Sequence, residues 1–241
     1  MNRAKLFNLM MLMTIFSLVY SCGPASESPD ADESDLVDET LVNTPFTREV
    51  KFDTCLLIAH KVKAYDVWKA SFDIAQSIRE KHGIKALSVY RDRTDTSLAL
   101  VYTQVTNLKS ARDYITSQNL QKSMASAGVM DAMDLYWMTR QLSGTEPITD
   151  SILMFMSFKV MNYDRWESAF LEDYKDEPNR ENQVKTVMRG IDDPNQVSMI
   201  FAVNDIDYVE KMEKNNVFRA KMLASGVVSY PVTYKLLEMQ L

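Results

Sequence analysis

The sequence contains one segment twice, 98 residues apart. Residues 61–72 read KVKAYDVWKASF and residues 159–170 read KVMNYDRWESAF. An ungapped register sustained along both copies indicates an internal duplication. The same offset aligns these further identical pairs: Val89 with Val187, Arg91 with Arg189, Asp95 with Asp193, Val105 with Val203, Met124 with Met222, Gly128 with Gly226 and Tyr136 with Tyr234.

Each copy predicts the order strand, helix, strand, strand, helix, strand, which is the split β-α-β or ferredoxin-like unit. The first strand is a nearly continuous apolar run, as expected for a strand covered on both faces. Tyr65, Trp68 and Phe72 then fall on one stripe of a helix, and Tyr163, Trp166 and Phe170 repeat that stripe. The predicted ranges in the two copies are strand 54–62 and 151–160, helix from about 65 and 163, hairpin 85–93 with 97–105 and 183–189 with 196–203, second helix from about 107 to 128 and 205 to 226, and last strand 131–140 and 230–239.

The duplication predicts an α+β protein of two tandem ferredoxin-like β-α-β-β-α-β repeats, repeat 1 over 51–143 and repeat 2 over 149–241. Residues 144–147, Gly-Thr-Glu-Pro, form a short linker by their Gly and Pro. One such unit covers a single face of its sheet with helices and leaves the other face to be buried. The second repeat supplies that cover, so we expect the two sheets to pack face to face about a pseudo-twofold axis.

The N-terminus has the features of a secretory signal over residues 1–21. Arg3 and Lys5 precede an apolar run over 6–20, which is too short to span a membrane comfortably. The end of the run, Val-Tyr-Ser-Cys at 19–22, resembles a bacterial lipobox, although Tyr20 departs from its usual residue. The resemblance implies a lipid anchor on Cys22 and a protein held to a membrane of the bacterial envelope. The alternative is an ordinary signal peptide with a chance cysteine.

Residues 22–50 predict a disordered acidic tether. This stretch is rich in Ser, Pro, Asp and Glu, and such a composition cannot bury a core. Its eight acidic residues and one arginine give it a net charge of −7, and Arg3 and Lys5 add +2, so of the total of −6 about −1 belongs to the folded part. A basic face is therefore not expected, and nucleic acid is not a predicted partner.

Several motifs resemble the dimeric α/β-barrel superfamily, in the subset labelled antibiotic-biosynthesis-monooxygenase-like. They are HKVxxYDxWxxxFD at 60–73, Gly83, Tyr-Arg-Asp at 90–92, Ala111, MxxAGV at 124–129, and RxxDDPNxV at 189–197. The resemblance implies that the two repeats form an intramolecular pseudo-dimeric α/β barrel, so that one chain needs no second copy. It is specific for fold rather than activity, because the superfamily includes cofactor-independent oxygenases, haem-binding proteins and proteins of no known role.

Candidate ligand-binding residues are those with a polar tip near an apolar run: His60, Tyr65, Trp68, Arg91, Tyr102 and Tyr136. For Trp68 and Trp166 we favour a core role over a pocket role, because aromatic residues at helical spacing usually pack inward. His60 is a general base or haem ligand in one interpretation and a structural residue in the favoured one. Arg91 binds a carboxylate or forms an ion pair at the strand end. Cys55 is expected to be a buried hydrophobe.

Two functions remain open. The first is a tethered envelope protein that binds a small apolar ligand or acts as a scaffold, and the alternative is a cofactor-independent monooxygenase-like enzyme for a small apolar or aromatic substrate. With only two histidines a multi-histidine metal site is excluded, and no phosphate-binding glycine loop or CxxC occurs, so we predict neither metal nor cofactor. Any ligand is expected in repeat 1, because Phe158 replaces His60 and Ile200 replaces Tyr102 in repeat 2.

Overall fold

The computed structural model describes residues 38–48, 54–145, 152–176 and 182–240. All of them belong to one folded unit, Asp38–Leu241. The predicted signal segment, Cys22 and most of the predicted tether lie outside the described residues.

Both repeats have the predicted order of elements. Each of the four strands of repeat 1 begins 98 residues before its counterpart in repeat 2, and so do the first helix and the last helix. Repeat 1 contains β2 Thr54–Lys61, α1 Tyr65–Ile74, α2 Gln76–Lys81, β3 Ile84–Asp92, β4 Leu98–Val105, α3 Leu108–Ile115, α4 Gln118–Ser126 and β5 Asp134–Gly144. Repeat 2 contains β6 Ile152–Lys159, α5 Tyr163–Asp176, β7 Asn182–Gly190, β8 Gln196–Val203, α6 Tyr208–Lys214, α7 Asn216–Ala224 and β9 Val232–Met239.

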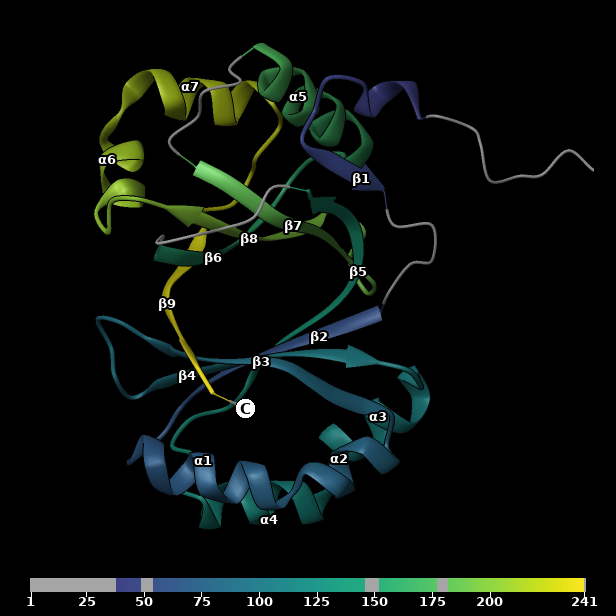
Figure 1. The fold of residues 1–241 in the computed structure, drawn as a ribbon, viewed down its shortest axis with the longest axis vertical. Coiled ribbons are helices and arrows are strands. Elements are labelled where there is room, and N and C mark those ends of the chain that lie inside the picture. The colour runs from purple at the N-terminus through teal and green to yellow at the C-terminus, as the bar shows by residue number, and fades with distance from the viewer. Residues whose placement is uncertain (1–37, 49–53, 146–151, 177–181, 241) are drawn as a thin grey trace, which may run out of the picture. The chain divides into compact units, whose positions relative to one another are not determined.

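The sheets of the two repeats face each other and also join into a closed barrel. The strand order is β5-β2-β4-β3-β9-β6-β8-β7, and β7 pairs back onto β5. The last strand of each repeat therefore pairs with the first strand of its own repeat and with the second strand of the other repeat. In this way β5 pairs with β7 and β9 pairs with β3. Figure 1 looks along this barrel, with the helices of the two repeats on its outer sides. The predicted pseudo-dimeric barrel is confirmed.

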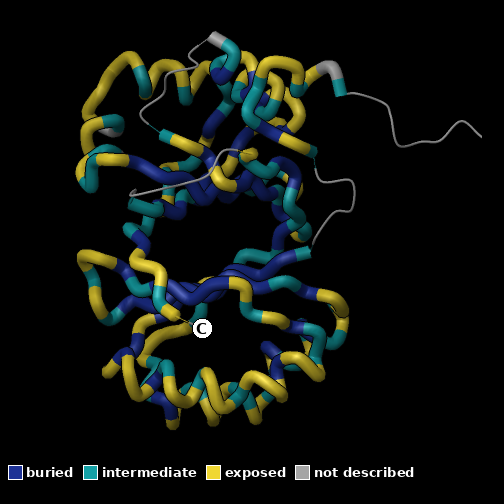
Figure 2. Tube along the Cα trace, viewed as in Figure 1, coloured by how far each residue is buried: buried dark blue, intermediate teal, exposed yellow. Residues whose placement is uncertain are grey.

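The two joints obey the pseudo-twofold symmetry of the duplication. Arg91 pairs with Leu237 at one joint, and Arg189 pairs with Thr139 at the other, each partner being offset by 98 residues. Closure leaves neither sheet with a bare inner face, because each supplies apolar side chains to a shared barrel core. This barrel core comprises Cys55, Leu57, Ala59, Tyr90, Leu100, Tyr102, Met138, Phe155, Met188, Ile200 and Leu236. Figure 2 shows buried strands inside and exposed outer helix faces.

The helices differ from prediction mainly by being interrupted. The predicted second helix is two helices in each repeat, because Ser117 and Asn215 each cap a new helix by accepting backbone N–H bonds. Asn162 caps α5, with its Oδ1 accepting the Arg165 N–H at 2.8 Å. The predicted breaks at Gly128 and Gly226 are confirmed, since both have φ near +90°, a conformation that glycine adopts without strain.

The segment 38–48 corrects the predicted boundary of the tether at residue 50. It forms a 3₁₀ turn η2, Glu39–Leu41, and a strand β1, Phe46–Arg48, that pairs with β5. Phe46 is only 5% exposed, and Arg48 lies within salt-bridge distance of Asp38 and Glu167. The average composition of residues 22–50 does not reveal this short segment. Burial of its apolar side chains against α5 stabilises it although the surrounding sequence is acidic.

Candidate functional site

A cavity of about 460 Å³ lies in repeat 1, between the outer face of its sheet and the layer of α1, α2, α3 and α4. That volume is within the range of small-molecule sites, and its lining is mostly apolar, as such sites usually are. The sheet contributes Ile58, His60, Ile84, Val101 and Thr103, the first two helices contribute Trp68, Ser71, Phe72, Ala75, Ile78 and Arg79, and the rest comes mainly from α3 and α4, including Asp113, Tyr114, Leu120 and Met124.

Strand alternation directs His60 toward this cavity. Leu57 and Ala59 belong to the barrel core, so Ile58 and His60 face the helices. The His60 ring meets Trp68 edge to face, with ring centroids 5.1 Å apart. Trp68 in turn stacks on Phe72 at 5.3 Å, so the predicted aromatic stripe of α1 forms one wall. Trp68 is 1% exposed, and its predicted core position is confirmed.

His60 is a buried imidazole with unused hydrogen-bonding capacity. It is 4% exposed, and neither ring nitrogen has a hydrogen-bond partner among the described residues. Burial lowers the pKa of His60 from 6.5 to about 4, so the ring is neutral at pH 7. One nitrogen of a neutral imidazole donates and the other accepts. The His60 ring therefore keeps one unused donor and one unused acceptor at the sheet side of the cavity.

Arg79 on α2 is a second buried polar group of the cavity, and it is not among the ligand-binding residues predicted from the sequence. It is 8% exposed, its guanidinium carbon lies 3.5 Å from the centroid of the Phe72 ring, and its Nη1 donates to the Phe72 carbonyl. The position of Arg79 in the sequence nevertheless indicates that it is buried. Residues 65, 68, 72, 75 and 79 continue one helical stripe, so Arg79 puts a charge on the apolar face of the first helical region.

Two other candidates lie beside the cavity rather than in its lining. Tyr65 is packed against Trp68 at 5.4 Å, its hydroxyl has no partner in the described part of the chain, and burial raises its pKa to about 12. The Arg91 guanidinium lies 5.0 Å from the Tyr65 ring centroid, and its Nε donates to the Thr96 carbonyl. Arg91 therefore holds the hairpin and the start of α1 together.

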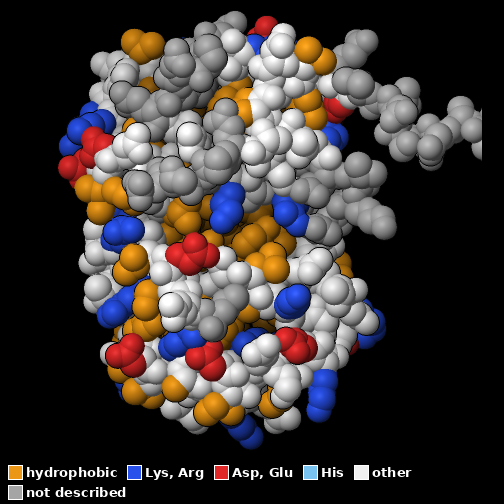
Figure 3. All heavy atoms as spheres, in the orientation of Figure 1, with side chains coloured by type: hydrophobic (Ala, Val, Ile, Leu, Met, Phe, Trp, Pro, Cys, Tyr) orange, Lys and Arg blue, Asp and Glu red, His pale blue; other side chains and the backbone are white. Residues whose placement is uncertain are grey.

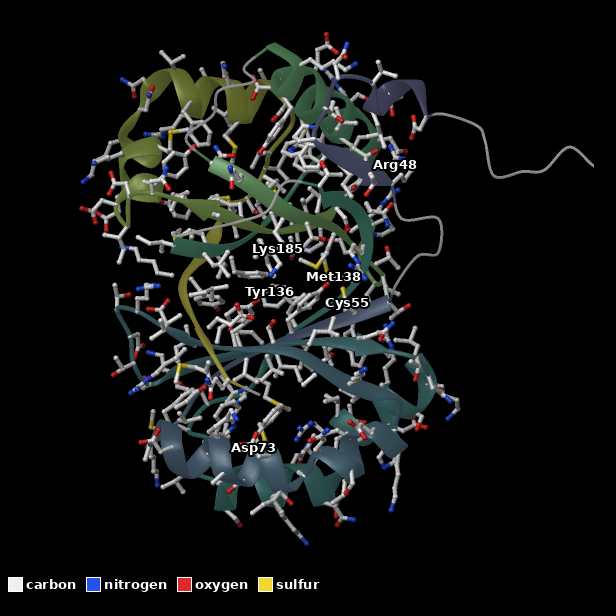
Figure 4. The ribbon with its side chains drawn as sticks, viewed as in Figure 1. Arg48, Cys55, Asp73, Tyr136, Met138 and Lys185 are labelled. Atoms are coloured by element: carbon white, nitrogen blue, oxygen red, sulfur yellow. The ribbon has the colours of Figure 1, made fainter. Side chains whose placement is uncertain are left out.

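Tyr102 and Tyr136 lie on the opposite face of the sheet from His60. Both are cross-strand neighbours of Leu57, whose side chain enters the barrel core. Figure 4 shows Tyr136 between the two sheets, near Cys55 and Met138, whereas Asp73 marks the helix layer outside. His60 and Trp68 therefore share the cavity, whereas the candidates Tyr102 and Tyr136 do not line it. Adjacent residues of a strand point to opposite faces, which assigns Val101 and Thr103 to the cavity and Tyr102 to the core.

The matching space in repeat 2 is filled by larger side chains. The positions equivalent to His60, Val101 and Thr103 are Phe158, Met199 and Phe201, and all three are buried in one core cluster. Strand β1 adds a further ring to that cluster. Phe46 contacts Phe170 and Tyr174, with centroids 5.6 and 4.9 Å apart.

Cys55 behaves as the predicted buried hydrophobe. Its Sγ lies 3.6 Å from both the Met138 carbonyl and the Met188 Sδ, inside the barrel core. Among the described residues no three His, Cys, Asp or Glu side chains gather as they would around a metal ion. The described helices are all too short or too polar to cross a membrane.

A smaller hollow of about 340 Å³ opens beside the end of β2, with several acidic residues in its lining. Two of these acids already have partners within the fold. The Asp92 carboxylate accepts the backbone N–H groups of Thr94, Asp95 and Lys235, and Asp95 pairs with Lys61 at 2.9 Å. These carboxylates hold the hairpin and β9 in place, so we do not take the hollow as the functional site.

Comparisons with known proteins place the fold but not the activity. No family model matches the sequence, and no curated protein matches it. Among solved structures, an anthrone oxidase-like protein is 11% identical with a TM-score of 0.52, covering 80% of this chain and 94% of that one. A candidate monooxygenase from Fusobacterium nucleatum is 10% identical with a TM-score of 0.51 over the same shares.

The chain has the dimeric α/β-barrel fold. In this protein both halves of the barrel come from one polypeptide. At about one residue in ten identical, the likeness to these structures extends to the fold alone. The choice between binding and catalysis therefore rests on the cavity itself.

Proposed function

We propose that the protein is a small-molecule-binding module whose repeat 1 cavity takes a small, mainly apolar or aromatic molecule. The observation that carries this proposal is the 460 Å³ cavity with His60 in its wall, buried and unpaired among the described residues. A buried polar group without a partner is costly, and a ligand that bonds to it removes that cost. Repeat 2 gives the contrast, because Phe158 and its neighbours fill the same space.

The ligand test uses 1-aminoanthracene, an uncharged aromatic probe whose fluorescence rises in apolar sites. We expect saturable binding to the wild type and a loss of affinity of about tenfold or more in His60→Phe, because the larger ring occupies cavity volume and removes the polar contact. Phe158→His is the matched control in repeat 2 and should bind the probe as the wild type does. Unchanged binding in His60→Phe together with loss in Phe158→His would place the site in the other repeat.

We further propose that the module is tethered to a membrane of the bacterial envelope through a lipidated Cys22, as a monomer with an internal pseudo-dimer. Support comes from the sequence at 1–22 and from the barrel that one chain completes. On the face shown in Figure 3, acidic and basic side chains are interspersed, which suits tethering by lipid better than by charge.

Replacing Cys22 is expected to release the protein from the membrane. In Cys22→Ala the attachment atom is gone, so membrane fractionation should show the protein in the aqueous fraction, and labelling with palmitate should disappear. Cys55→Ala is the matched control, because Cys55 is the other cysteine of the chain and is buried in the barrel core. Equal membrane retention and labelling of Cys22→Ala and the wild type would refute the anchor.

A specific observation favours one alternative, an oxygenase-like enzyme. The neutral His60 ring can accept a proton from an acidic C–H or O–H group of an aromatic substrate. This proton transfer is the step that a side chain can perform in a cofactor-independent oxygenation. One of the similar structures is named an anthrone oxidase-like protein. The wild type would then turn substrate over, and His60→Phe would not. If His60→Gln also loses turnover but still binds the probe, His60 acts in catalysis and not only in binding.

A further inference from the structure

Arg79 is a buried cation with little of its hydrogen-bonding capacity used. Its guanidinium carries five N–H donors and stays charged at any pH a protein tolerates. The described contacts are one bond from Nη1 to the Phe72 carbonyl and the stacking on the Phe72 ring, while Nε is buried without an acceptor. Burial lowers the pKa of Arg79, the direction expected where the positive charge is poorly compensated.

Asp73 and Glu80 are the acidic side chains that act on the Arg79 charge, and both are engaged elsewhere; the Glu80 Oε1 accepts a hydrogen bond from the Gln76 amide at 2.9 Å. Asp73 pairs with Lys69 at 2.7 Å, and Asp113, which lines the cavity, pairs with Lys109 at 2.7 Å. The side chains of Asp73 and Asp113 are well exposed, 48% and 66%. No carboxylate within the described ranges forms a salt bridge with Arg79. A buried charge without a carboxylate partner among the described residues marks a candidate functional site, because a ligand can supply that partner.

We propose that Arg79 binds the carboxylate of the ligand, so that the cavity selects apolar or aromatic monocarboxylates. This inference rests on the proposed function and refines it. The planar guanidinium fork matches a carboxylate in two parallel hydrogen bonds. The apolar body of such a molecule would lie along Trp68 and Phe72, with His60 available to a second polar group.

A monocarboxylate fits the cavity better than a phosphate does. Among the described lining residues Arg79 is the only Lys or Arg, and the Nδ1 of His82 is already within 3.1 Å of the Ser110 hydroxyl. One positive charge balances one negative charge, whereas a phosphate dianion would enter an apolar space half compensated. Repeat 2 has Glu177 at the position equivalent to Arg79, so the duplication has not kept this charge.

The test compares anthracene-2-carboxylate with anthracene-2-carboxamide, which has nearly the same shape and no charge, by displacement of 1-aminoanthracene. In the wild type we expect the acid to bind about tenfold or more tightly than the amide, and the preference to persist at high salt because the pair is buried. In Arg79→Met, which keeps a long side chain over Phe72, the acid should fall to the level of the amide. The control Arg165→Met removes an exposed arginine on α5 of repeat 2, outside the cavity lining, and should keep the preference.

The outcomes separate this inference from the proposed function. Equal binding of acid and amide by the wild type overturns the role of Arg79 while leaving a small-molecule site in place, and so does a preference that survives in Arg79→Met. The wild-type comparison can by itself overturn the role of Arg79, and Arg79→Gln, which removes the charge and keeps a polar side chain, repeats the variant test if Arg79→Met folds poorly. A wild type that binds neither compound and does not bind 1-aminoanthracene overturns both.

Discussion

Trp166→Ala is expected to lower the free energy of unfolding by about 3–5 kcal/mol, the usual cost of removing a buried large aromatic side chain. Trp166 is 4% exposed and contacts three rings, those of Phe158, Tyr163 and Phe170, with centroids 5.2–5.7 Å apart. Its loss leaves a hole that neighbours from the sheet and α5 can close only in part. Urea unfolding followed by circular dichroism measures the change.

Trp68→Ala at the equivalent place in repeat 1 should be costly too, but less so than Trp166→Ala. Trp68 is as deeply buried, yet one side of it borders the cavity rather than packed atoms, so fewer contacts are lost. Ile74→Ala, at an 84% exposed position on the same helix, is the control and should change stability by about 0.5 kcal/mol or less. Losses well below 1 kcal/mol at both tryptophans would contradict their assignment to the core.

Acid is expected to destabilise the wild type more than His60→Phe. The His60 pKa is about 4 in the folded protein and 6.5 when unperturbed, so between these values the unfolded chain binds a proton that the folded chain does not. Stability is therefore unaffected by this group above pH 6.5 and falls as the pH drops from 6.5 toward 4. By linkage the difference reaches about 2–3 kcal/mol at pH 4.5.

The measurement is urea unfolding of both proteins at pH 7.0 and pH 4.5. Carboxylates with lowered pKa, such as Asp95 and Asp193, also cost stability in acid, but they are common to both proteins and cancel in the difference. Arg79, His82 and Asp113, which line the same cavity, are likewise shared. Phenylalanine is a fair replacement because Phe158 occupies the equivalent position in repeat 2. Identical pH dependence in the two proteins would show that His60 is not buried as described.

Much of the fold could be predicted because its information is local and repeated. The 98-residue offset relates the starts of all four strands in one repeat to those in the other, and helical periodicity identifies Trp68 and Trp166 as core residues. Strand alternation separates Tyr102 from Val101 and Thr103, but which of these residues shares a face with His60 depends on the register between β2 and β4. Arg79 could also be predicted as a site residue from the sequence, because it is the one charged residue on an apolar helical stripe.

The sequence by itself determined the two repeats, their strand order and the inward faces of their helices, since these follow from side-chain spacing within a few turns or strands. Only the tertiary structure decided that β5 pairs with β7 and β9 with β3, because edge pairing between repeats depends on how two sheets meet in space. It also decided which repeat keeps a cavity. Whether a space is open depends on the summed volume of side chains from distant segments, and Phe46, from a strand within the predicted tether, helps to fill repeat 2 while repeat 1 stays open.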